Sequence, residues 1–83
     1  MAHWNHRVVV KEYKSSTGEI EKFYGIHEVY YDDKGNPDGV TEESVSPVGD
    51  SLTDIKNSLD RMKKACTLPV LNYDTDFKSG DDA

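Results

Sequence analysis

The strongest constraint on the fold is a run of apolar residues with helical spacing in the C-terminal half. These residues recur every three or four positions: Leu52, Ile55, Leu59, Met62 and Cys66. Such a stripe is typical of an amphipathic helix that packs one side on a core. We therefore predict a helix over residues 52–66, capped by Asp50 or Ser51 and with the Cys66 thiol buried.

Two extended segments precede the predicted helix. Residues 4–13 and 20–31 are rich in β-branched and aromatic side chains, which favour strands. Residues 14–18, between them, are small, polar and end in glycine, as expected of a hairpin turn. The two segments therefore predict an antiparallel pair.

The second segment departs from strict alternation. Apolar residues fall on both parities, and the change occurs at Gly25. An isolated glycine in a strand pattern commonly marks a bulge. We therefore predict a bulge at Gly25, and we expect Phe23 and either Ile26 or Val29 in the core.

The segment that follows predicts a loop and a weaker strand. Residues 32–39 are rich in Asp, Asn, Gly and Pro, which favour turns. Residues 40–45 or 40–48 predict a strand whose polar side chains suit the edge of a sheet, where they discourage unwanted pairing. The pattern therefore predicts an α+β fold, a three-stranded antiparallel β-meander packed on one C-terminal amphipathic helix. We expect one domain over residues 1–73 and an acidic disordered tail over residues 74–83.

Charge and composition restrict the class of partner. The formal net charge is −6, and residues 32–54 carry seven acidic groups against one basic group. This charge opposes direct nucleic-acid binding and favours a protein with a basic or neutral surface. A homodimer stays open as an alternative. With no apolar run of about 20 residues, no secretion-signal pattern and the single Cys66, we expect a cytoplasmic protein and no membrane partner.

Catalytic, metal and cofactor chemistry find little support in the residue pattern. His3 and His6 are three positions apart on a predicted strand, so their side chains point to opposite faces. The loop at 32–39 fails the calcium-binding EF-hand pattern, because Lys34 and Val45 fall where carboxylates are needed. Glycine-rich phosphate-binding motifs do not occur in the sequence. We therefore predict no enzyme activity, no metal site and no cofactor.

Three stretches resemble a known family. They are residues 4–9 (WNHRVV), residues 24–32 (YGIHEVYYD) and the helix exit Leu59-x-x-Met62-x-x-x-Cys66-x-x-Pro69-Val70-Leu71. In them the chain resembles a family of small bacterial and phage-type proteins with no established activity. The likeness covers most of residues 3–73. It implies a recurring compact domain and transfers no functional residue.

The leading functional hypothesis is a non-catalytic protein-interaction module with an acidic binding surface. The candidate binding residues lie on the second strand, the loop after it and the third strand: His27, Glu28, Tyr30, Tyr31, Asp32, Asp33, Glu42 and Glu43. One alternative is an acidic inhibitor of a nucleic-acid-binding host-defence complex, whose carboxylates would imitate backbone phosphates. A second alternative is a small metal-binding protein that uses His27 with carboxylates.

Overall fold

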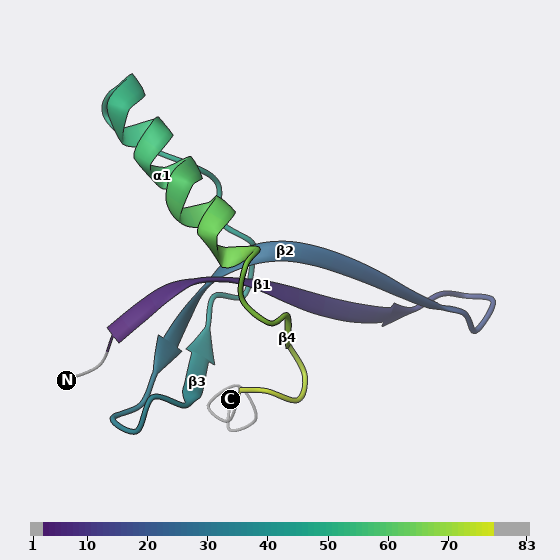
Figure 1. The fold of residues 1–83 in the computed structure, drawn as a ribbon. Helices are drawn as coiled ribbons and strands as arrows, with labels where there is room; N and C mark the ends of the chain where they lie inside the picture. Colours follow the sequence, from purple (N-terminus) through teal and green to yellow (C-terminus); the bar gives the residue numbers. More distant parts are fainter. Residues whose placement is uncertain (1–2, 78–83) are drawn as a thin grey trace.

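The fold is a curled four-stranded sheet with one helix, seen in a computed structural model that describes residues 3–77 (Figure 1). The elements, in chain order, are β1 (His3–Lys14), β2 (Ile20–Tyr31), β3 (Pro37–Val40), α1 (Leu52–Ala65) and β4 (Leu71–Asn72). The sheet order is β3-β2-β1-β4, with β4 parallel to β1 and the other neighbours antiparallel. The predicted α+β class is confirmed.

The predicted three-stranded meander was incomplete, because β4 adds a parallel strand to the free side of β1. β4 is only two residues long, which is too short for any alternation to appear in the sequence. Contacts with a distant part of the chain hold it in place. Leu71 pairs with Val9, and the Pro69 carbonyl oxygen accepts a hydrogen bond from Arg7 Nη2 at 2.7 Å.

The β1–β2 hairpin is continuous along its length. Its turn is closed by Gly18, whose φ of 90° suits a residue without a side chain. Gly25 pairs in register with Val9, so the predicted bulge at Gly25 is wrong. The glycine instead permits a close approach, because a Cβ there would lie 3.0 Å from the Ser44 Cβ. The register shift that does occur lies between Tyr30 and Tyr31, against β3.

The third strand begins earlier than predicted. The Asp32 carboxylate accepts hydrogen bonds from the Lys34 and Asn36 amides, both at 2.9 Å, and this tight turn lets pairing start at Pro37. Regular pairing ends at Val40, whereas the prediction began there. The chain nevertheless continues beside β2, since the Val45 amide donates to the Ile26 carbonyl at 2.8 Å.

The core lies on the side of the sheet that residues 71–77 cover. Val9 and Val29 are fully buried there, together with Tyr31 and Phe77. The sequence prediction assigned Phe77 to a disordered tail, but the side chain is 2% exposed and belongs to the core. The composition of residues 74–83 predicted disorder because most of the neighbours of this aromatic residue are acidic or polar. The rest of the predicted tail, residues 78–83, lies outside the described residues.

The helix has nearly the predicted bounds, and Ser51 caps it by accepting a hydrogen bond from the Asp54 amide at 3.1 Å. Its buried positions are Ser58, Met62 and Ala65, whereas Cys66 is exposed, so the predicted burial of the thiol is wrong. The buried side of the helix ends at Ala65, and Cys66 follows it as the C-cap residue. The helix packs on β1 near this end, and its N-terminal end extends away from the sheet (Figure 1). No helix within residues 3–77 combines the length and apolar character needed to cross a membrane.

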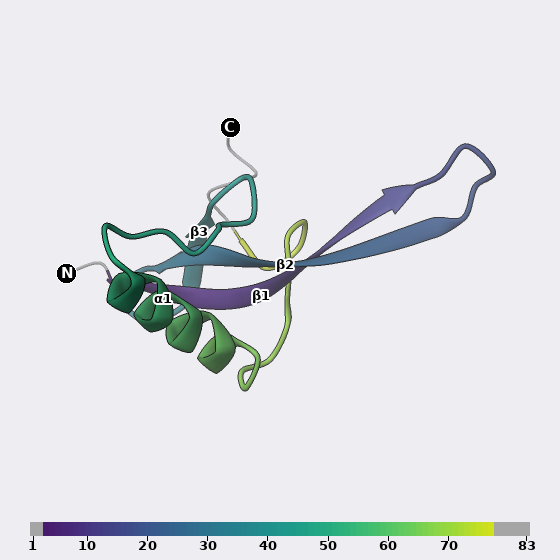
Figure 2. The same ribbon diagram turned by 90° about the horizontal axis from the view of Figure 1, so that it is seen from above.

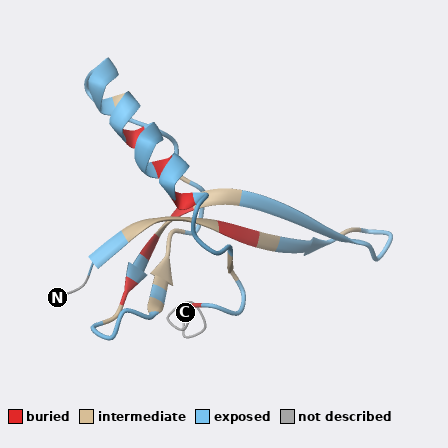
Figure 3. Ribbon diagram, viewed as in Figure 1, coloured by how far each residue is buried: buried red, intermediate tan, exposed pale blue. Residues whose placement is uncertain are grey.

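The far half of the hairpin projects from the body of the molecule (Figures 2 and 3). We call residues 12–24 the arm. Phe23 lies in it and is 57% exposed, so the prediction that Phe23 belongs to the core is wrong, while Val29 is buried as expected. The slip in alternation now has a physical reason: where neither face of a ribbon is covered, apolar residues can occupy both parities.

Candidate functional site

The predicted binding residues on β2 do not share a face. Side chains alternate along a strand, so His27 and Tyr31 point to one side of the sheet and Glu28 and Tyr30 to the other. The first pair is buried, at 2% and 8% exposure, and the second lies on the more open side. Residues adjacent in the sequence are therefore divided between the core and the surface.

The buried pair maintains the fold. His27 Nδ1 donates a hydrogen bond of 2.9 Å to the Thr41 carbonyl oxygen, which fixes the ring tautomer and ties the segment after β3 to the sheet. The Tyr31 hydroxyl donates to Asn5 Oδ1 at 2.6 Å and accepts from Arg7 Nη1 at 3.0 Å. These hydrogen bonds satisfy the Tyr31 hydroxyl and Asn5 Oδ1, as is usual for polar groups inside a protein. Arg7 Nε, in contrast, is buried without a hydrogen-bond partner among residues 3–77.

The half-buried Glu28 and the exposed Tyr30 form one local interaction. The Tyr30 hydroxyl donates to Glu28 Oε1 at 2.7 Å. This hydrogen bond to a carboxylate, with smaller contributions from desolvation and from the Glu28 charge, raises the pKa of Tyr30 above its ordinary value of 10.0. The Tyr30 phenol therefore gives up its proton less readily than a free tyrosine does.

The predicted acidic surface is divided as well. Asp32 and Asp33 lie in the turn before β3, while Glu42 and Glu43 follow the other end of that strand. Lys11 binds the second pair to the sheet: its Nζ donates to the Glu42 carbonyl oxygen and lies 3.9 Å from Glu43 Oε2. The four carboxylates therefore do not converge on one point.

The histidines do not converge either. His3 stacks on Tyr31 with ring centroids 5.2 Å apart, whereas His6 meets Trp4 edge to face at 5.4 Å on the opposite side of β1. The prediction that His3 and His6 point apart is confirmed. Among residues 3–77, no group of three or more His, Cys, Asp or Glu side chains is arranged to hold a metal ion.

One feature missed by the sequence analysis is a groove between the start of β1 and the end of the helix. Its volume is about 540 Å³, and its lining includes the chain's single tryptophan: Trp4, Asn5, His6, Arg61, Lys64, Ala65 and Leu68. No carboxylate lines it, and neither Arg61 nor Lys64 forms an ion pair with a carboxylate of residues 3–77. The spacing of Arg61 and Lys64, three positions apart on a helix, was the available signal.

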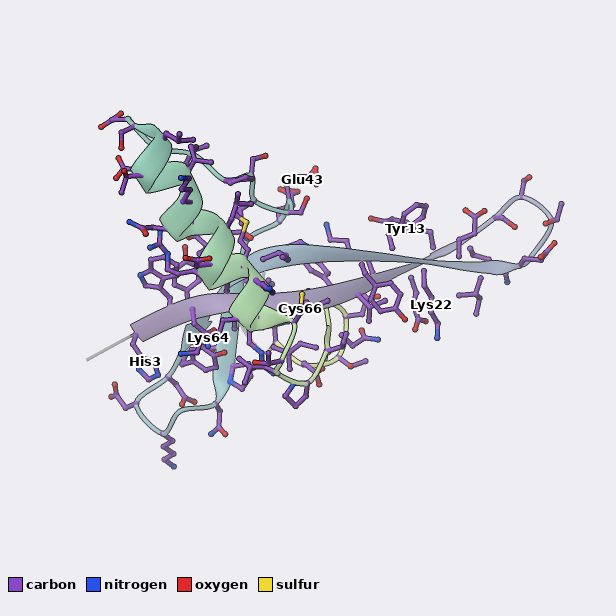
Figure 4. All side chains as sticks on the ribbon, turned by 45° about the horizontal axis from the view of Figure 1, so that its top comes forward. His3, Tyr13, Lys22, Glu43, Lys64 and Cys66 are labelled. Atoms are coloured by element: carbon purple, nitrogen blue, oxygen red, sulfur yellow. The ribbon has the colours of Figure 1, made fainter. Side chains whose placement is uncertain are left out.

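The second missed feature is the arm. Its large apolar residues are exposed to a degree unusual for a small domain, with Tyr13 at 48%, Phe23 at 57%, and Ile20 and Tyr24 both at 64%. Tyr13 and Phe23 meet edge to face at 5.4 Å, and they border a hollow of about 560 Å³ where the arm joins the body. Figure 4 shows Tyr13 and Lys22 on opposite sides of the ribbon.

Both edges of the arm carry unpaired backbone groups. The Ser15 amide bonds the Glu19 carbonyl across the hairpin, and the Tyr73 amide bonds the Val10 carbonyl on the other side of β1. The backbone N–H and C=O groups of even-numbered β1 residues therefore point away from β2. Along β2 the even-numbered Ile26 also faces outward, where it bonds Val45. Within residues 3–77, the outward amides and carbonyls at Glu12, Lys14, Lys22 and Tyr24 have no strand beside them.

Comparisons with protein-family models, with curated proteins and with solved structures find no match for this chain.

Proposed function

We propose that this protein is a non-catalytic protein-interaction module that presents its hairpin arm to a partner. The carrying observation is the combination of exposed apolar side chains on both faces of the arm with open backbone edges on both sides. A partner strand can pair with such an edge while its side chains contact the arm's aromatic residues, as in strand-addition recognition.

The arm has features that a merely solvated hairpin does not need. A two-stranded ribbon is marginally stable by itself, and exposed edges carry a risk of unwanted pairing. Four large apolar residues on such a ribbon add to that risk unless a partner covers them: Tyr13, Ile20, Phe23 and Tyr24. Their position far from the core supports a role in binding rather than in folding.

We propose a non-catalytic role because the residue most suited to acid–base chemistry is engaged in the fold. His27 is buried, and its Nδ1 proton is held by a backbone carbonyl oxygen.

The carboxylates that would have to act together in an acidic inhibitor lie at opposite ends of β3. We therefore favour the arm over the acidic surface at Asp32, Asp33, Glu42 and Glu43.

A capture experiment with matched variants tests this function. The bait is the full chain, exposed to a lysate of cells that naturally produce it, beside a Phe23→Ser/Tyr24→Ser variant. The control variant, Val48→Ser/Leu52→Ser, removes two apolar residues that are 71% and 70% exposed but lie outside the arm. We expect the same bound protein with wild type and control, and its loss with the arm variant.

The opposite pattern, with the bound protein kept by the arm variant and lost by the control, would contradict the proposal. Thermal denaturation of each bait, followed by circular dichroism, checks that all three are folded.

A second candidate function rests on the groove: binding of a small planar organic anion. Arg61 and Lys64 supply positive charge without an opposing carboxylate, and Trp4 supplies an aromatic wall that is half exposed. A groove of about 540 Å³ falls in the size range of small-molecule sites. The combination suits a ligand that joins a flat apolar body to a phosphate or carboxylate.

The fluorescence of Trp4 reports directly on this second function. We expect phenyl phosphate to change the emission in a saturable way, and neutral phenol to have a much smaller effect. Arg61→Ala/Lys64→Ala should abolish the saturable change, while Lys56→Ala, on the same helix but outside the groove, should keep it. An equal response to phenyl phosphate and phenol would argue against an anion site.

A further inference from the structure

The free edge of β1 is short and sharply bounded. On one side Tyr73 occupies the edge, where its amide donates to the Val10 carbonyl oxygen at 3.0 Å. On the other side the chain turns away at Ser15, whose amide bonds the Glu19 carbonyl. Between these limits, Glu12 and Lys14 direct their backbone groups outward and Tyr13 directs its own toward β2.

Two copies of this edge can pair antiparallel across a two-fold axis, and the charges select one register. A two-fold axis perpendicular to the sheet places one residue opposite its own copy. Centring the axis on Glu12 or on Lys14 sets like charges against each other, which is destabilising. Centring it on Tyr13 sets Glu12 of each copy opposite Lys14 of the other.

The backbone agrees with the same register. With Tyr13 at the centre, the outward amide and carbonyl of Glu12 face those of Lys14 in the second copy. Each such pair exchanges two hydrogen bonds, so the contact gains about four in all. The second copy's turn then begins level with Lys11, where the first copy's Tyr73 already ends the free edge. The space available therefore matches a pairing of three residues.

The side chains on the two faces also match. The axis keeps each face of the sheet on its own side, so the two Tyr13 rings meet directly. Each ring already stacks edge to face on Phe23 of its own chain, at an interplanar angle of 72°. The result is a row of four aromatic rings on one face and two Glu12–Lys14 pairs on the other. The free edge of β2 offers less, because centring on Lys22 opposes like charges and centring on Phe23 pairs no charges.

We infer that the partner of the arm's β1 edge is a second copy of this chain, paired antiparallel with Tyr13 at the two-fold axis. This inference rests on the proposed role of the arm as an interaction surface. The contact spans three residues of each strand, so the dimer belongs with small, transient interfaces of less than about 1,200 Å². The dimer forms as the protein concentration rises and dissociates on dilution.

Charge reversal with rescue tests the pairing. Sedimentation equilibrium of the full chain, in reducing buffer because Cys66 is exposed, gives the average mass from about 10 μM to about 1 mM, a range suited to a weak complex. We expect wild type to approach the dimer mass at the upper end. Glu12→Lys and Lys14→Glu should each stay monomeric, and the double variant should dimerise like wild type.

The control is Asp60→Lys, a charge reversal at an exposed position of α1 outside the arm, which should leave dimerisation unchanged. A monomeric wild type, or single reversals that dimerise normally, would overturn the inference. If self-pairing fails while the Phe23→Ser/Tyr24→Ser bait still loses its bound protein, the proposed function stands without it. If the dimer forms but capture does not depend on the arm, the proposed function fails and self-pairing stands.

Discussion

The two halves of the β1–β2 ladder differ in what covers them. In the body, residues 71–77 cover one face and the helix packs against β1, whereas no element within residues 3–77 covers either face of the arm. The chain's two phenylalanines make the contrast concrete, since Phe77 is 2% exposed and Phe23 is 57% exposed. One continuous hairpin therefore holds two kinds of apolar residue: those that stabilise the fold and those left free for a partner.

The largest expected difference between the halves is the cost of losing each phenylalanine. Phe77→Ala removes a buried ring and should lower the free energy of unfolding by about 3–5 kcal/mol. Phe23→Ala loses mainly its contact with Tyr13 and should cost less than about 1.5 kcal/mol. Urea denaturation followed by circular dichroism measures both. A similar loss in the free energy of unfolding for the two variants would show that Phe23 is buried in a core, contrary to the comparison.

The hydroxyl groups of two tyrosines give a smaller contrast. Tyr31→Phe leaves Asn5 Oδ1 and one Arg7 donor without their partner and should cost about 1–3 kcal/mol. Tyr24→Phe, in the arm, removes a hydroxyl with no hydrogen bond to residues 3–77 and should change stability by less than about 0.5 kcal/mol. The same urea titration applies. A neutral Tyr31→Phe would mean that water replaces the lost hydroxyl.

The smallest expected effect concerns Tyr30, on the more open side of the body. Because the folded state raises the pKa of this phenol, it binds the proton more tightly than the unfolded chain does. The resulting contribution to stability is fully present below pH 10.0 and is lost as pH rises through the raised pKa. Ultraviolet titration of tyrosinate, as the difference between wild type and Tyr30→Phe, should place this step above the ordinary value. Glu28→Gln should lower it, and an unmoved step would contradict this cause.

Local patterns predicted β1, β2 and the helix well, but they misplaced β3 and missed β4. The helix bounds follow from the spacing of Leu52 to Met62 and from the Ser51 cap, both of which act within a few residues. Burial was harder, because it depends on distant segments. Cys66 is exposed since it follows Ala65, the last buried residue of the helix, and Phe77 is buried since its segment returns to Val9 and Val29.

The candidate site was less predictable than the fold. Strand alternation alone separates His27 from Glu28, so the division of that cluster could have been derived from the sequence. The arm could not, because an exposed Phe23 or Tyr24 has the same strand-favouring character as a buried one. Only the apolar residues on both parities of residues 20–24 indicated that the ribbon there is uncovered.

The contact between Arg7 and Pro69 has a consequence for the order of folding. The two residues are 62 positions apart, so the contact closes a much longer loop than the hairpin turn does. During synthesis the hairpin leaves the ribosome first and can form from neighbouring residues, while β4 and Phe77 arrive later. Until they arrive, Val9 and Val29 face solvent, so the body of the nascent chain exposes apolar side chains as the arm does after folding.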